Sequence, residues 1–196
     1  MFGAKSCEAR PVQLYKFSVK ANIFQHNAQV LRKLKNDIEL SYPNRDRDEQ
    51  HRLLWVNACE RFHNSFDELA FPGGLTRELS LLKEADEQAI ELAIRFLEVD
   101  PWFFRSGYIK EQLLRLIARV ELSDNQQERL RSVILERIET GGRREFRKYS
   151  QLARQLDVPT FRKAVLERAE LGDVHIRRRA WWILTSLERS GRTKSL

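Results

Sequence analysis

Helical periodicity interrupted by well-spaced prolines is the feature that most constrains the fold of this chain. From residue 24 onward apolar side chains recur every three or four positions, as Ile90, Ala93, Ile94 and Leu97 do, which is the spacing of one helix face. Four prolines fall between such segments: Pro43, Pro72, Pro101 and Pro159. Because proline lacks an amide hydrogen, it is tolerated at the start of a helix and breaks its interior. The sequence therefore predicts an all-α fold.

The apolar pattern divides into a series of helices with recognisable ends. We expect helices at residues 24–40, 46–69, 75–83, 86–98, 106–119, 124–139, 143–156, 159–170 and 173–189. Side chains that accept hydrogen bonds from free amides precede several of them, and we expect four to be caps: Asp86, Ser123, Asp157 and Asp173. Residues 1–23 lack a clear period and are expected to form an arm or a short docked helix. A single all-α domain then covers residues 24–196.

The last six expected helices form antiparallel pairs of similar length. These pairs are 86–98 with 106–119, 124–139 with 143–156, and 159–170 with 173–189. Their starts are about 38 and 35 residues apart, a period typical of stacked helical hairpins.

One stretch resembles the second-helix signature of a HEAT repeat, in which an aspartate precedes a β-branched residue, an arginine and an alanine: Asp173, Val174, Arg177 and Ala180, then Ile183 and Leu184. The earlier pairs share the length and the apolar pattern without that signature. The resemblance implies that residues 86–189 form three HEAT-like hairpins, stacked as a short α-solenoid. It also implies that Arg177 pairs between repeats and that the chain is a binding scaffold.

The net charge of +7 arises entirely in the second half of the chain. Residues 1–94 carry 13 basic and 14 acidic side chains, whereas residues 95–196 carry 22 basic and 14 acidic ones. Of the 35 basic residues 25 are arginine, whose planar fork suits carboxylate and phosphate groups. The excess favours an acidic partner, either an acidic protein surface or nucleic acid. The alternative is that the excess basic residues lie on ordinary helix faces exposed to water and bind no partner.

The expected helix at 143–156 separates apolar from basic residues. Five cations share the side opposite its apolar stripe: Arg143, Arg144, Arg147, Lys148 and Arg154. Like charges at such spacing repel one another, and a bound anion would relieve that cost. The alternative is an ordinary solvated face, balanced by acidic residues of a neighbouring helix.

The last expected helix repeats this theme with an aromatic residue. Arg178, Trp182 and Arg189 project away from the apolar stripe that contains Ile176 and Ile183. Arg178 and Trp182 are four residues apart, so they can form a cation–π pair. The pair could serve as a protein hot spot or as a platform for nucleobases. The alternative is that Trp182 packs beneath the N-terminal arm or a nearby loop.

Other aromatic residues are expected in the core. One group follows Pro101 and is predicted to fill the corner between two helices: Trp102, Phe103 and Phe104. A second group lies on the long helix at 46–69: Trp55, Phe62 and Phe66.

Several classes of protein are disfavoured. No run approaches the roughly 18 apolar residues that a membrane span requires, and the first residues lack the apolar stretch of a secretory signal. Cys7 and Cys59 cannot form a disulfide framework, so we expect a reducing cytoplasm. Cys59 and His63 share a helix face, but two ligands do not form a zinc site. We therefore predict no metal and no cofactor.

No catalytic constellation converges in the sequence. Arg45 and His51 have the Arg-x₅-His spacing of HEPN ribonucleases, yet so arginine-rich a chain is expected to contain such a match by chance. The tryptophans of the last helix also resemble those of helical-repeat alkylpurine DNA glycosylases, but no catalytic aspartate can be placed. We therefore predict no enzymatic activity and no catalytic residue. The expected function is a scaffold or adaptor that binds an acidic protein through the Arg-rich face, with nucleic acid as the alternative ligand.

Overall fold

The computed structural model describes residues 12–141 and 145–193, with side chains described for residues 23–141 and 145–189. All secondary structure in these ranges is helical, which confirms the all-α prediction. The elements are α1 Val12–Ser41, the 3-10 helix η1 Tyr42–Asn44, α2 Glu49–Ala70, α3 Leu75–Lys83, α4 Glu87–Val99, α5 Ser106–Ile117, α6 Asp124–Thr140, α7 Phe146–Ala153, α8 Pro159–Leu171 and α9 Val174–Thr193.

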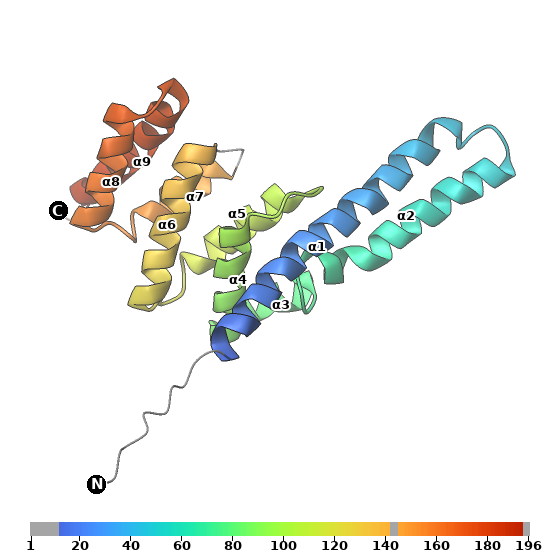
Figure 1. Cartoon of the computed structure of the whole chain (residues 1–196), viewed down its shortest axis with the longest axis horizontal. Helices are drawn as coiled ribbons and strands as arrows, with labels where there is room; N and C mark the ends of the chain where they lie inside the picture. Colours follow the sequence, from blue (N-terminus) through green and yellow to red (C-terminus); the bar gives the residue numbers. More distant parts are fainter. Residues whose placement is uncertain (1–11, 142–144, 194–196) are drawn as a thin grey trace, which may run out of the picture.

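The helices follow one another along an elongated molecule (Figure 1). The α1–α2 hairpin projects at one end, α3 to α5 lie in the middle, and α6 to α9 form the other end. Helix α1 begins at Val12, twelve residues before the expected start, and it is continuous through residue 24. Residues 1–11 of the expected arm lie outside the described residues.

An aromatic cluster joins the projecting hairpin to the rest of the core. The Phe24 ring of α1 meets the Phe96 ring of α4 edge to face, with centroids 5.3 Å apart. Phe71, which follows α2, stacks on Phe96 at 5.2 Å. The Phe103 ring meets Phe96 edge to face with centroids 6.4 Å apart, and all four rings are buried. Such edge and stacked contacts add to the free energy gained by burying each ring.

The C-terminal helices contact one another in a regular order. Helix α4 contacts α5 and α6, α6 contacts α7 and α8, and α8 contacts α9. The second members of the pairs also touch, since α5 contacts α7 and α7 contacts α9. We call α4, α6 and α8 the first row and α5, α7 and α9 the second row.

Three of the four expected caps are confirmed. The Asp86 and Ser123 side chains accept hydrogen bonds from the amides of Ala89 and Gln126, and Gln126 completes a capping box. Asp173 accepts hydrogen bonds from the amides of Ile176 and His175, which lower its pKa below the ordinary value.

The cap expected at Asp157 is wrong. Val158 occupies that position and provides no side-chain cap. The Asp157 carboxylate instead pairs with the Arg162 guanidinium. Pro159 at the first turn reduces the need for a cap, because its missing amide is one of the groups that a cap would satisfy.

Arg177 does not make the contact that was expected of it, and Arg179 contacts the backbone of α6 instead. The Arg179 Nε atom donates to the Ile138 carbonyl at 2.6 Å, and its Nη2 atom donates to the Glu139 carbonyl at 2.9 Å. These carbonyls lie in the last turn of α6, where cations are favourable. Arg177 is exposed, two residues away from this contact.

A buried ionic cluster lies at the junction of α4, α5 and α6. Asp100 ends α4 in a left-handed backbone conformation, and its carboxylate pairs with both Lys110 of α5 and Arg137 of α6. Lys110 is only 3% exposed and Arg137 only 7% exposed. Lys110 Nζ also lies 4.0 Å from the carboxylate of Glu145, the residue that precedes α7. The cluster therefore fixes the positions of four successive helices.

We predict that Asp100→Asn destabilises the protein by about 3 kcal/mol, because it leaves two buried cations without their shared carboxylate. Asparagine tolerates the left-handed conformation, so the backbone itself is not strained. Asp37→Asn is the control, since its pair with Arg61 at 3.5 Å is exposed and should contribute less than about 1 kcal/mol. Urea denaturation followed by circular dichroism measures the free energy of unfolding of both variants. An equal loss of stability in the two variants would contradict the structural role of the cluster.

Candidate functional site

A groove between α7 and α9 collects several of the predicted binding residues. It encloses about 490 Å³ and is lined in part by Arg147 of α7, by Arg154 directly after α7, and by Trp182 and Arg189 of α9. The same walls carry Phe146 and three hydroxyl groups, which belong to Ser150, Thr185 and Ser186. We call this feature the α7–α9 groove. The structure thus brings together cations that are up to 42 positions apart in the sequence.

Hydrogen bonds hold the two walls of the α7–α9 groove together. The Ser186 hydroxyl of α9 donates to the Ser150 carbonyl of α7 at 2.7 Å. The Arg154 Nε atom donates to the same hydroxyl at 3.0 Å. This arrangement orients the Arg154 guanidinium at the groove, while the side chain as a whole stays exposed. Its remaining donors can face an anion.

Trp182 is half exposed, which is unusual for an indole. Its exposed fraction is 50%, because Ala180, Ile183 and Leu187 occupy the buried side of α9. One part of the ring rests on buried Phe146, with centroids 5.9 Å apart. The Arg178 guanidinium lies over the ring at 5.0 Å from its centroid, so the predicted cation–π pair is present.

The α7–α9 groove is strongly basic. None of its lining residues is acidic. Among the described residues no carboxylate lies within ion-pair distance of Arg147, Arg154 or Arg178. A groove with several cations and no acidic lining residue is suited to an anionic ligand.

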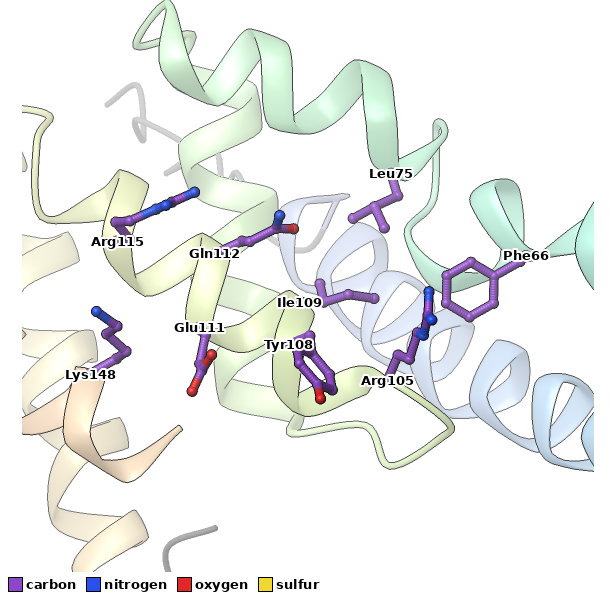
Figure 2. A pocket seen from close by; sticks show the side chains of 9 residues that line it. All are labelled: Phe66, Leu75, Arg105, Tyr108, Ile109, Glu111, Gln112, Arg115 and Lys148. Carbon is purple, nitrogen blue, oxygen red and sulfur yellow. The ribbon is translucent and has the colours of Figure 1, made fainter. Parts of the chain in front are cut away.

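Lys148 does not belong to this groove, although it is the next residue after Arg147. It lines a second groove of about 590 Å³ between α5 and α7 (Figure 2). We call this the α5–α7 groove. Arg143 and Arg144 lie outside the described residues, so the structure does not place them.

The prediction that Trp102 and Phe104 are core residues is wrong. They are 51% and 47% exposed, whereas Phe103 between them is buried as expected. Arg32 lies 5.7 Å from the centre of the Trp102 ring, and Lys35 lies 5.5 Å from that of Phe104. Consecutive residues in a loop cannot all face one core, so the cations of α1 contact the two rings that point outward.

On the long helix α2, the core prediction holds for Phe62, which is buried, and in part for Phe66, which is half-buried and packs against the core. Trp55 is half-buried and lies outside the core cluster. The reason is that α2 projects with α1, so only part of it is covered by other helices.

Sequence reasoning missed the residues of α5 that line the α5–α7 groove. Arg105, Tyr108, Gln112 and Arg115 line it together with Glu111. Their spacing of three and four residues marks one helix face, and it is the signal that could have identified them.

The residues considered for catalysis or metal binding have local partners. The Arg45 guanidinium lies 3.8 Å from the centre of the Tyr42 ring, and His51 Nδ1 lies 2.7 Å from the Asp48 carboxylate. Within the described part of the chain no three histidine, cysteine or acidic side chains are grouped as a metal site would need. A membrane-spanning helix is likewise not found there, because no described helix combines the necessary length and apolar character.

Comparison with models of protein families, with curated protein sequences and with solved structures gives no match for this chain. The candidate site therefore depends on its own geometry and charge.

We predict that Trp182→Ala lowers the free energy of unfolding by only about 1 kcal/mol, because half of the ring is already in water. Phe146→Ala removes the buried ring that contacts Trp182, and it should lower the free energy of unfolding by about 3–5 kcal/mol. Urea denaturation measured by circular dichroism compares the two. A loss for Trp182→Ala as large as that for Phe146→Ala would show that the indole is a core residue and not an exposed contact.

Proposed function

We propose that this protein is a non-enzymatic scaffold that binds an acidic segment of a protein partner through the α7–α9 groove. In this proposal α4 to α9 form three HEAT-like hairpins, stacked as a short α-solenoid. The observation that carries the proposal is the basic groove itself, which Arg147, Arg154 and Arg189 line together with the half-exposed Trp182 and in which no lining residue is acidic.

The order of helix contacts supports a stacked arrangement. Each first-row helix contacts the next first-row helix, and each second-row helix contacts the next one in its own row. The last hairpin carries the aspartate cap at Asp173, and Arg179 joins it to α6. The Asp173 cap agrees with the resemblance of this segment to a HEAT repeat, whereas the contact with α6 is made by Arg179 and not by the expected Arg177. Repeat scaffolds of this kind present extended surfaces on which partners bind.

A protein ligand fits the mixed chemistry of the groove. The Trp182 and Phe146 rings offer apolar contact, the hydroxyls offer hydrogen bonds, and the arginines offer bidentate partners for carboxylates. Tryptophan and arginine are the side chains most often found at the centres of protein interfaces. The lining residues include no histidine, cysteine or carboxylate that could act as a nucleophile or general base, so a binding role is favoured over catalysis.

Nucleic acid is the second candidate ligand. The specific observation in its favour is the half-exposed Trp182 ring beside several arginines, since nucleobases stack on such rings while phosphates pair with cations. The cysteine content, with only Cys7 and Cys59, is the basis for proposing the cytoplasm as the compartment.

The test compares two fluorescent probes, a glutamate-rich peptide and single-stranded oligo-dT of similar length and charge. We predict tighter binding of the peptide. We also predict that the double variant Arg147→Gln/Arg154→Gln weakens it about tenfold, or ~1.4 kcal/mol. Lys163→Gln, an exposed lysine of α8 on the first row, is the matched control and should have no effect. Affinity should fall as salt rises, because the contacts are ionic.

Three results would count against the proposal. No binding of either probe at low salt would contradict it outright. Tighter binding of oligo-dT, with a steep dependence on salt, would favour the nucleic-acid alternative. An equal effect of the control and double variants would show that net charge alone, and not the α7–α9 groove, attracts the anion.

A further inference from the structure

Helix α7 forms a ridge between two grooves. Its neighbouring residues Arg147 and Lys148 line different sides, with Arg147 in the α7–α9 groove and Lys148 in the α5–α7 groove. Because α5, α7 and α9 contact one another in order, both grooves lie along the same row of helices. Packed helices are about 8–10 Å apart, so the distance from α5 to α9 is roughly 20 Å. About six residues of extended chain cover that distance.

The α5–α7 groove has an apolar part and a cationic part. Phe66 of α2, Leu75 of α3 and buried Ile109 of α5 provide the apolar wall. Figure 2 shows Phe66 and Leu75 at one end of the groove, with Arg115 and Lys148 at the other. The volume of about 590 Å³ is ample for a large apolar side chain with its neighbours.

Two of the cations at this groove lack an ion-pair partner among the described residues. Lys148 Nζ donates a hydrogen bond to the neutral Gln151 side chain at 3.2 Å. Within the described ranges no carboxylate lies within ion-pair distance of Arg115 or Lys148. The groove has one acidic lining residue, Glu111, against three basic ones. Its electrostatic field therefore attracts negative charge toward an apolar wall.

We propose that the α5–α7 groove is a second binding site, which takes an apolar or aromatic side chain of a peptide segment flanked by carboxylates. This inference rests on the proposed function, because the same segment crosses the α7 ridge and places its further carboxylates in the α7–α9 groove. The apolar anchor lies against Phe66, Leu75 and Ile109, and the flanking carboxylates meet Arg115 and Lys148.

The apolar wall favours a peptide over a nucleic acid at this site. A nucleic acid carries a phosphate at each nucleotide and has no aliphatic or phenyl side chain to place against Phe66, Leu75 and Ile109. A peptide can place an apolar side chain against that wall and its carboxylates at Arg115 and Lys148. The apolar wall also gives a free-energy gain that depends on buried apolar area and not on salt.

The experiment uses peptides of about ten residues, which exceeds the roughly six that reach from α5 to α9. The first peptide has one phenylalanine among glutamates, and the second has serine in its place. Fluorescence anisotropy on the full chain should show about tenfold tighter binding of the phenylalanine peptide. Lys148→Gln and Leu75→Ala should each weaken that peptide at least threefold. The controls are Lys163→Gln and Leu171→Ala, both at exposed positions of α8, which should change nothing. Thermal melts establish that every variant is folded.

The outcomes separate this inference from the proposed function. Equal affinity of the two peptides, with Arg147→Gln weakening both, would overturn the second site and leave the α7–α9 groove standing. Failure of both peptides to bind would overturn both proposals. Displacement of the bound phenylalanine peptide by oligo-dT at a lower concentration than by unlabelled peptide would overturn the peptide assignment. Loss of the phenylalanine advantage in Leu75→Ala, with no loss in Leu171→Ala, would support the apolar wall.

Discussion

The position of Asp100 is the constraint on which the arrangement of the later helices depends. Its carboxylate pairs with two cations that are almost completely buried, Lys110 of α5 and Arg137 of α6. Burying a charge without a partner costs several kcal/mol, so these three residues are stable only when the three helices meet as observed. Lys110 also approaches Glu145, which precedes α7. The cluster therefore determines where α7 lies, and α7 separates the two proposed binding grooves.

The two rows of helices differ in whether their arginines form ion pairs. In the first row, Arg129 of α6 forms ion pairs with Glu91 and Glu98 of α4 at 2.6 Å each. The hydrogen bonds that the Arg129 guanidinium donates to Glu98 and, to a lesser extent, to Glu91 raise the pKa of Arg129 above its ordinary value. In the second row, Arg147 and Arg154 have no such carboxylates among the described residues. Two cations without a carboxylate partner among the described residues, Arg147 and Arg154, thus line the α7–α9 groove.

Local patterns in the sequence predicted the helices well, because apolar spacing and caps such as Asp173 depend on neighbouring residues. These local patterns failed for residues whose exposure and neighbours depend on contacts between helices. A helical wheel places Arg147 and Lys148 on one face, whereas the ridge formed by α7 directs them into different grooves. The α5–α7 groove combines residues as distant as Phe66 and Lys148, and no local pattern joins them. The exposure of Trp102 likewise follows from the path of a loop.

The most direct test of the account is to locate a bound acidic peptide by zero-length carbodiimide cross-linking, which joins a carboxylate to a lysine in contact with it. Lys148 is the lysine that lines the α5–α7 groove, and Lys163 of α8 is more exposed to solvent but belongs to the other row. Mass spectrometry of the cross-linked protein should find the glutamate-rich peptide joined to Lys148 and not to Lys163. Cross-links at Lys163 as frequent as those at Lys148 would contradict binding along the second row of helices.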